Sequence, residues 1–461
     1  MAAPPVSLSP NSPLTPDAKL PAGLMFKLST MMFLQLFIWG AWFELGFNYI
    51  PALNFKEPWM NPLMYGAFNI GALVAMFFST QFADRNFAAE KFLSFSHLIG
   101  GLAIGGIFFL HPAEGESGDF WPFFGLMLLH SVFYVPTMSI TNSIAFNAFT
   151  NPEKQFGPVR LWGTIGWIVA SWPFIFILVD WAAVSTKQTY GVMDWLGTAL
   201  GTGLTGRAAM DGQRYIFLVA GVASLVLSAF SLVLPHTPPK PAVAGQDNLA
   251  WLKAVKLLRN PLILVLFIVT FIDAAVHQTY FVLTPGFLNK PAAGGVVGIE
   301  SNWVAPVMKI GQIAEIVTML ALGWVLKTLG WRITMIVGVL GHAVRFAVFA
   351  FFPQPEPSIA IIAIHGVCYA FFFATVYIFV DKYFPKDIRS SAQGLFNLLI
   401  LGVGPFVGNF VISKIMELNT VDKVVLYQKV FLYPMGAALF GAILLALFFR
   451  PKDNPSSDLP A

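Results

Sequence analysis

The stretch RLWGTIGW occupies residues 160–167 and opens an apolar run that continues to about Val179. A run of this length can cross a bilayer, and an arginine inside it costs at least ~2.5 kcal/mol on insertion scales. Thr164 follows Arg160 by one helical turn and Trp167 comes a turn later, so the three share a face. Two interpretations are open at this point. The face binds a solute, or the arginine is an anchor beside a tight Gly/Thr helix contact.

The composition of the whole chain agrees with a membrane protein. Of its 461 residues 57% are hydrophobic and 11% are charged, where a soluble domain has about 25% charged residues. The mean hydropathy is +0.71. These values predict an all-α polytopic protein whose surroundings are a lipid bilayer. The net charge of +4 is too small to indicate a nucleic-acid partner, and the single cysteine, Cys368, excludes an intrachain disulfide.

Apolar runs of spanning length recur along the chain. Twelve are found, at roughly 25–50, 62–83, 92–110, 120–147, 158–180, 215–234, 261–287, 303–326, 332–352, 357–380, 391–414 and 426–449. An even number places both termini on one side. The connections on that side carry about twice as many lysines and arginines as the others, so both termini are expected in the cytoplasm.

The polar connection in the middle divides the twelve runs six and six. The sequence predicts a disordered tail, a first six-helix bundle, a cytoplasmic linker, a second six-helix bundle and a short tail, at residues 1–22, 23–235, 236–260, 261–450 and 451–461. The long connection at 181–214 contains a Gly/Thr-rich stretch, which favours flexibility, and the sequence assigns it no function.

Short basic turns follow the second and eighth runs. Asp84 and Arg85 lie in the first turn, and Lys327 and Arg332 lie in the second. Both resemble the turn signature of the major facilitator superfamily, Gly-x-x-x-Asp-Arg-x-Gly-Arg-Arg, although the glycine that follows the Asp-Arg pair is missing. In such folds two similar halves rock about a site at mid-depth.

Charged and polar residues inside the runs are candidate functional groups. Asp273 and His277 share a face of the seventh run, with Gln278 turned aside. Asp273 lies near mid-depth, where a lone carboxylate can bind a proton. A buried pair with a histidine or an arginine is the alternative.

The eighth run carries Lys309, Gln312 and Glu315 on one broad face. Gln312 and Glu315 can donate to and accept from a polar solute, whereas Lys309 is expected to pair with a carboxylate or to reach outward. His365 and Tyr369 are four residues apart in the tenth run.

Three further charged or titratable residues lie inside runs. Glu44 is near the external end of the first run, where it can face a water-filled vestibule, and His342 and Arg345 in the ninth run are interpreted as structural. Enzyme motifs, a phosphate-binding loop and paired metal-ligand cysteines are not found, so neither an enzyme nor a metal or cofactor is predicted.

Several segments together resemble the bacterial nucleoside:proton symporter family, and the similarity runs over essentially the whole chain. They are FLQLFIWGAW at 33–42, RLWGTIGW at 160–167, LPHTP at 234–238, QIAE at 312–315, RFA at 345–347 and RSSAQG at 389–394.

The resemblance implies a twelve-helix major facilitator fold and uptake of nucleosides with protons. In the family pattern the residues that line the central cavity match this chain at Arg160, Thr164, Gln278, Gln312 and Glu315.

Other positions depart from the family pattern. Trp167 replaces the usual Phe, Phe281 replaces a polar residue, and His365 and Tyr369 correspond to a Tyr and a Phe. Glu44 stands where a small polar residue is expected. These departures make the identity of the solute less secure than the fold.

The favoured hypothesis is a monomeric nucleoside:proton symporter of the bacterial inner membrane. Trp167 and Tyr369 would stack on the base, and polar residues of the cavity, His365 among them, would meet the solute. Glu315 is the first choice for the coupling proton, followed by Asp273 and Glu44. The alternatives are a transporter of another polar solute, such as a sugar, a modified nucleoside or a cell-wall fragment, and a non-transporting membrane sensor.

Overall fold

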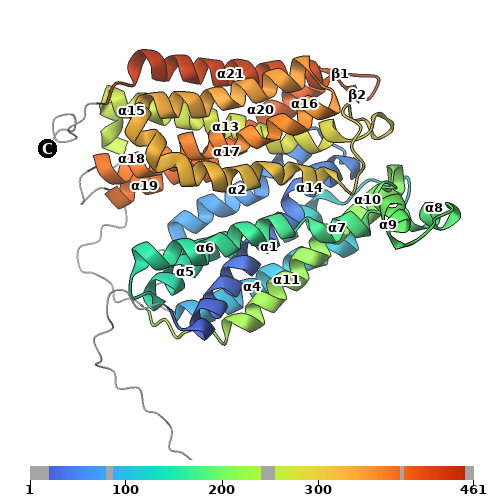
Figure 1. Ribbon diagram of the computed structural model, residues 1–461, viewed down its shortest axis with the longest axis horizontal. Helices are drawn as coiled ribbons and strands as arrows, with labels where there is room; N and C mark the ends of the chain where they lie inside the picture. Colours follow the sequence, from blue (N-terminus) through green and yellow to red (C-terminus); the bar gives the residue numbers. More distant parts are fainter. Residues whose placement is uncertain (1–19, 79–86, 240–254, 385–388, 452–461) are drawn as a thin grey trace, which may run out of the picture.

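The computed structural model describes residues 20–78, 87–239, 255–384 and 389–451. The turn with Asp84 and Arg85, most of the predicted linker at 236–260 and nearly all of both predicted tails lie outside the described residues. The described elements are almost entirely helical, and Figure 1 shows them in two groups that follow the two halves of the sequence.

The first half supplies one group of helices, drawn blue to green in Figure 1. They are α1 (Ala22–Ala52), α2 (Met60–Phe78), α4 (Ala89–Ile107), α5 (Phe120–Ala148), α6 (Pro152–Val169), α7 (Trp172–Ile177), α8 (Trp181–Thr186), α9 (Val192–Leu200), α10 (Gly206–Gln213) and α11 (Tyr215–Ser231), with a 3-10 turn, η2 (Phe108–Leu110). The connection at 181–214 therefore folds into three short helices, which extend from one end of the group.

The second half supplies the other group. Its elements are η3 (Lys256–Arg259), α13 (Pro261–Leu288), η4 (Pro291–Ala293), α14 (Val304–Met308), α15 (Ile310–Phe351), α16 (Pro355–Ala360), η5 (Ile361–Ile364), α17 (His365–Cys368), η6 (Tyr369–Ala374), α18 (Thr375–Tyr383), α19 (Arg389–Asn397), η7 (Leu398–Val403), α20 (Gly404–Leu418), β1 (Thr420–Val421), β2 (Val424–Val425) and α21 (Tyr427–Phe448). The two strands pair antiparallel, with Thr420 opposite Val425.

Ten helical segments among the described residues are long and apolar enough to cross a membrane. The eighth and ninth predicted spans form the single element α15, which is interrupted at Gly330, where φ is +69°. Glycine adopts this left-handed conformation without steric cost. The fifth predicted span is divided into α6 and α7 by the turn at Ala170 and Ser171.

The stretch at 160–167, which lies in α6, packs tightly on α1. A Cβ atom added to Gly166 would collide with the backbone of Phe33, and one added to Gly40 would lie 2.8 Å from the carbonyl oxygen of Trp167. Glycine is therefore required where the two backbones approach each other. The predicted tight helix contact is present on this side of α6.

The two groups meet at the end of the molecule that carries α8, α9 and α10. We name this contact the α10-side seam. Its hydrogen bonds run from Asn289, Ser301, Asn302 and Trp303 of the second half to Asn48, Ile175, Leu200 and Leu204 of the first, over 2.6–3.3 Å. Four of these five bonds end on backbone carbonyls. The seam therefore depends on the positions of the backbone carbonyl groups in α7 and at the end of α9.

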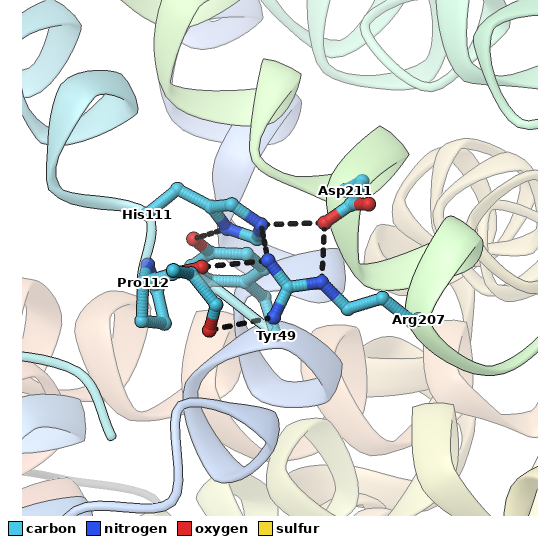
Figure 2. Close-up of polar contacts among 6 residues, drawn as sticks. Tyr49, His111, Pro112, Arg207 and Asp211 are labelled. Carbon is cyan, nitrogen blue, oxygen red and sulfur yellow. Dashed lines mark hydrogen bonds and ion pairs between the residues drawn. The ribbon is translucent and has the colours of Figure 1, made fainter. Parts of the chain in front are cut away.

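Helix α10 is fixed to the first group by a cluster around His111 (Figure 2). The Nε2 atom of His111 lies 2.6 Å from Asp211, and Nδ1 lies 2.8 Å from the hydroxyl of Tyr49. Arg207 contacts Asp211 at 2.7 Å and donates to the carbonyl of Pro112 at 2.6 Å. This cluster positions α10 and, through it, the first-half side of the seam.

Candidate functional site

A cavity of about 280 Å³ lies between the two groups of helices. This volume is close to the lower end of the ~300–1,000 Å³ found for small-molecule pockets. Aromatic side chains of both halves make up much of its wall, and a few polar side chains interrupt them. Such a lining can bind a solute that has a flat apolar face and polar edges.

From the first half, α6 presents one face to the cavity. Arg160, Thr164 and Trp167 all line it, as their spacing of four and three residues on a helix requires. The ring of Trp167 meets Trp39 of α1 edge to face at 5.0 Å. The glycines between these residues face α1, so α6 combines a packing face with a cavity face.

From the second half, α13 and α15 contribute Gln278, Gln312 and Glu315. Glu315 is partly exposed to the cavity, and the charged group that acts on it across the cavity is Arg160. A guanidinium of the first half and a carboxylate of the second therefore line the same cavity, and both can hydrogen bond to a solute in it.

His365 and Tyr369 complete this wall from the tenth predicted span. Tyr369 begins a π-helical segment, Tyr369–Ala374, and the cavity residues Ile400 and Leu401 lie in a second one, Leu398–Val403. Such single π-helical turns occur frequently at functional sites. In this chain both of them border the cavity.

The amide of Gln278 takes part in a chain of hydrogen bonds between the halves. It donates to Asn409 at 2.9 Å, Asn409 donates to Asn69 at 3.2 Å, and Asn69 donates to the carbonyl of Leu401 at 2.9 Å. Because Gln278 and Asn69 both line the cavity, a solute that bonds to either one acts directly on a contact between the halves.

The structure brings together all eight residues that the sequence predicts to bind the solute. Arg160, Thr164, Trp167, Gln278, Gln312, Glu315, His365 and Tyr369 line the one cavity. Of the three predicted proton carriers only Glu315 is among them. Glu44 and Asp273 do not border the cavity.

Glu44 does not face a vestibule. It is 1% exposed, and Lys309 Nζ lies 2.9 Å from its carboxylate. Lys309 also stands 4.5 Å from the ring centre of Trp167. Glu44 and Trp167 belong to the first half and Lys309 to the second, so a buried ion pair with a cation–π contact joins the halves next to the cavity.

Asp273 is fully buried in the second half, behind the cavity wall. Its nearest charged or titratable partner is His342, whose Nε2 atom is 3.6 Å from Oδ2. Arg345 donates to Nδ1 of His342 at 2.7 Å and to Nδ1 of His365 at 3.1 Å. His342 and Arg345, which the sequence presented as structural, thus connect Asp273 to a residue of the cavity wall.

Several cavity residues were not predicted from the sequence. Asn69, Tyr65 and Tyr377 line the cavity, and so does His277, which the sequence presented as a candidate group of the seventh run but did not assign to the solute site. A lone asparagine in the apolar run at 62–83 was a usable signal for Asn69. The described residues contain no group of three or more His, Cys, Asp or Glu side chains that could hold a metal ion. The cavity is suited to reversible binding through hydrogen bonds and aromatic stacking.

The chain is similar to known proteins over nearly its whole length. The family model described as Nucleoside H+ symporter matches residues 22–193 and 188–454. The chain is 30% identical over 446 residues to the putative nucleoside transporter YegT of Escherichia coli strain K12, covering 93% of this chain and 94% of that protein. It is 26% identical over 445 residues to the xanthosine permease of the same strain, covering 94% of this chain and 97% of that protein.

Among solved structures, the nucleoside transporter NupG superimposes with a TM-score of 0.74 at 24% identity, over 93% of this chain and 100% of that one. A likeness at this identity shows the fold, which is the major facilitator fold. With the family model matched from residue 22 to residue 454, the chain belongs to the nucleoside H+ symporter family.

Proposed function

We propose that this protein takes up nucleosides together with protons across the bacterial inner membrane. One observation carries the proposal. Residues from helices of both halves converge on a single cavity that is aromatic, polar at a few points and of small-molecule size. A cavity shared by two halves is where alternating access requires the solute to bind. Membership of the family supplies the class of solute and the coupling ion.

We further propose how the chain lies in the membrane. Counting α2 as a span and α15 as two spans that meet at Gly330 gives twelve, in two sets of six. The excess of lysine and arginine on the terminal side places both termini in the cytoplasm. The α10-side seam is then external, and its hydrogen bonds hold the external side closed in this conformation.

In this proposal Trp167 and Tyr369 stack on the base, because every nucleobase presents a π-face. Arg160, Thr164, Gln312 and Glu315 meet the ribose hydroxyls and the edges of the base, with Gln278 and His365 on the same wall. These polar side chains include both hydrogen-bond donors and acceptors, as the polar edges of a nucleoside do.

Glu315 is the first carboxylate to which we assign a coupling proton, because it alone of the three candidates borders the cavity. Protonation of Glu315 removes its attraction to Arg160 of the first half. The relative stability of the two arrangements of the halves therefore changes with its charge. Glu44 is assigned to the ion pair with Lys309 instead.

The experiment is uridine and xanthosine uptake by proteoliposomes with and without an inward proton gradient. We expect accumulation only with the gradient, and we expect Glu315→Gln to lose the dependence on it. The matched control is Glu356→Gln, because Glu356 is exposed and lies outside the cavity. Uptake that ignores the gradient would contradict symport, and failure to take up any nucleoside would contradict the proposed solute.

A second candidate function is transport of another polar solute in the same cavity. It is favoured by Trp167, Phe281 and His365, which line the cavity and differ from the family pattern. A thermal-shift panel of nucleosides against sugars separates the two. Stabilisation by sugars alone would favour the second candidate.

A further inference from the structure

The second half contains a buried cluster of titratable groups at and behind the cavity wall. Binding of a solute does not by itself explain why these groups are gathered there. Asp273 and Arg345 carry its charges, and His277, His342 and His365 surround them. Neither oxygen of Asp273 has a hydrogen-bond partner among the described residues. A fully buried carboxylate in this condition is rare, because an ion removed from water needs compensating bonds.

Arg345 determines how the neighbouring histidines hold their protons. A guanidinium group can only donate hydrogen bonds, and Arg345 donates to Nδ1 of both His342 and His365. Both neutral rings must therefore carry their proton on Nε2. The Nε2–H of His342 then faces Asp273, 3.6 Å away. The Nε2–H of His365 points at the amide of Gln312, whose nitrogen lies 3.5 Å away and whose Oε1 has no other partner among the described residues. Because two donors cannot bond, this tautomer requires the amide to be turned so that Oε1 accepts.

His277 links this cluster to the cavity. Its ring borders the cavity, lies 5.4 Å from His342 and 5.0 Å from His365 between ring centres, and has an unpartnered Nδ1 atom. It follows Asp273 by one helical turn. The two side chains share a face of α13, but the nitrogen that lies 3.6 Å from the Asp273 carboxylate belongs to His342.

We propose that Asp273 is a second proton-binding group of this transporter, that His277 carries the proton between it and the cavity, and that His342 positions the carboxylate. The assignment rests on the proposed proton-coupled uptake, and it adds a site outside the cavity to the one at Glu315.

The proton transfer balances in both directions. One nitrogen of His277 accepts a proton from water in the cavity, while its other nitrogen gives a proton to a bridging water molecule, which in turn gives one to Asp273. The imidazole ends neutral and the carboxylate becomes a carboxylic acid. Release follows the same route in reverse. The uncharged acid needs no counter-charge, whereas the carboxylate depends on Arg345, whose hydrogen bonds go to histidines.

The surroundings of Asp273 in the second half favour this role. The titratable or charged groups near it come from its own helix, from α15 and from α17, and they are His277, His342, Arg345, His365 and Cys368. Helices α20 and α21 approach the same part of α13 through Gly404 and Gly441, which lie against Ala274 and Ile272. The oxygens of Glu44 also lack a hydrogen bond of good geometry among the described residues, but Glu44 differs from Asp273 because Lys309 Nζ lies 2.9 Å from its carboxylate.

The test compares the wild type with Asp273→Asn and Asp273→Glu in proteoliposomes loaded with uridine. Counterflow at equal pH on both sides reports solute binding and the movement of the halves. The reversal potential reports the number of protons per uridine. We expect Asp273→Asn to retain counterflow and to lose about one proton per uridine, and Asp273→Glu, which keeps a titratable group, to retain the wild-type ratio.

A wild-type ratio in Asp273→Asn would overturn the assignment. If Asp273→Asn does not yield folded protein, His342→Gln carries the test, because it leaves the carboxylate and removes the donor that faces it. We expect its uptake profile against pH to shift, and a profile that superimposes on the wild type would overturn the assignment equally. Absence of counterflow in the wild type would instead contradict the proposed nucleoside transport.

Discussion

Gly166 lies where α6 crosses α1, and a side chain at this position has no space. Gly166→Ala places a methyl group against the backbone of Phe33, and overpacking of this kind costs about 1–3 kcal/mol. We expect a lower midpoint of thermal unfolding in detergent, followed by tryptophan fluorescence. Gly157→Ala is the matched control, because Gly157 is on the same helix and a Cβ atom added there has nothing within 4 Å. Equal midpoints for the two variants would contradict the packing argument.

The buried pair of Glu44 and Lys309 gives a second prediction for single side chains. Glu44→Gln leaves the lysine as an uncompensated buried charge, and breaking a pair in this way costs about 3–5 kcal/mol. Adding Lys309→Met removes that charge, so we expect the double variant to recover most of the lost thermal stability.

The control for this pair is Lys414 and Glu417, whose side chains are 61% and 50% exposed. Exposed pairs contribute about 0–1 kcal/mol, so Lys414→Met is expected to leave the unfolding midpoint nearly unchanged. If Glu44→Gln is as mild as this control, water reaches the Glu44 pair in the native protein.

The sequence could predict the location of some functional side chains in the structure, but not of others. Arg160, Gln312 and Glu315 are conspicuous in apolar runs and match a family pattern, and they do line one cavity. That they bind solute stays a prediction. The partners of Glu44 and Asp273 could not be predicted, because they lie on other helices whose rotation and depth depend on the packing of the whole bundle.

At the scale of elements, the contact of α10 with the first group of helices is expected to depend on pH. Burial, with the nearby Arg207 and Arg214, holds the pKa of His111 below its ordinary value of 6.5, and Asp211 opposes this only in part. The folded protein therefore favours the neutral ring. The stability from this contact is fully present above pH 6.5, the ordinary pKa of the unfolded chain. It is lost as the pH falls from there toward the lower pKa of the folded protein.

Hydrogen–deuterium exchange of residues 206–213 measures this effect, with rates corrected for the intrinsic dependence on pH. We expect protection at about pH 7.5 and faster exchange at about pH 5.5, on either side of the histidine range. His111→Asn cannot titrate in this range and should show no such difference. Equal protection of the wild-type segment at both pH values would contradict the role given to His111.

The elements themselves were predicted unequally. Long apolar runs reveal spanning helices because the thickness of the bilayer fixes their length, and the runs at 261–287 and 426–449 coincide closely with α13 and α21. The three short helices within 181–214 were not predicted. They are too short to show a period, and their glycines favour turns. Contacts with the second half, such as the bond from Trp303 to Leu200, help to hold them.

For the whole molecule, three carboxylates inside the predicted spans each have one cation. Glu315 faces Arg160 across the cavity, Asp273 lies near Arg345 within the second half, and Glu44 contacts Lys309 between the halves. Only the last is a direct ion pair, at 2.9 Å. The two looser carboxylates are those to which we assign protons, because they give up the least attraction on becoming neutral.

The α10-side seam leads to the last prediction, which concerns the movement of the two halves. If this seam opens in each transport cycle, linking its two sides must stop transport. Asn48 and Asn289 face each other across it, and Nδ2 of Asn289 lies 3.3 Å from Oδ1 of Asn48. The single native cysteine, Cys368, is buried and can be replaced by serine. We expect Asn48→Cys with Asn289→Cys, joined by a short cleavable thiol cross-linker, to lose uridine uptake and to regain it after reduction. Each single cysteine variant, treated in the same way, should keep its uptake. Transport that continues in the linked double variant would show that the halves need not separate at this end, and it would contradict the external gate that we propose here.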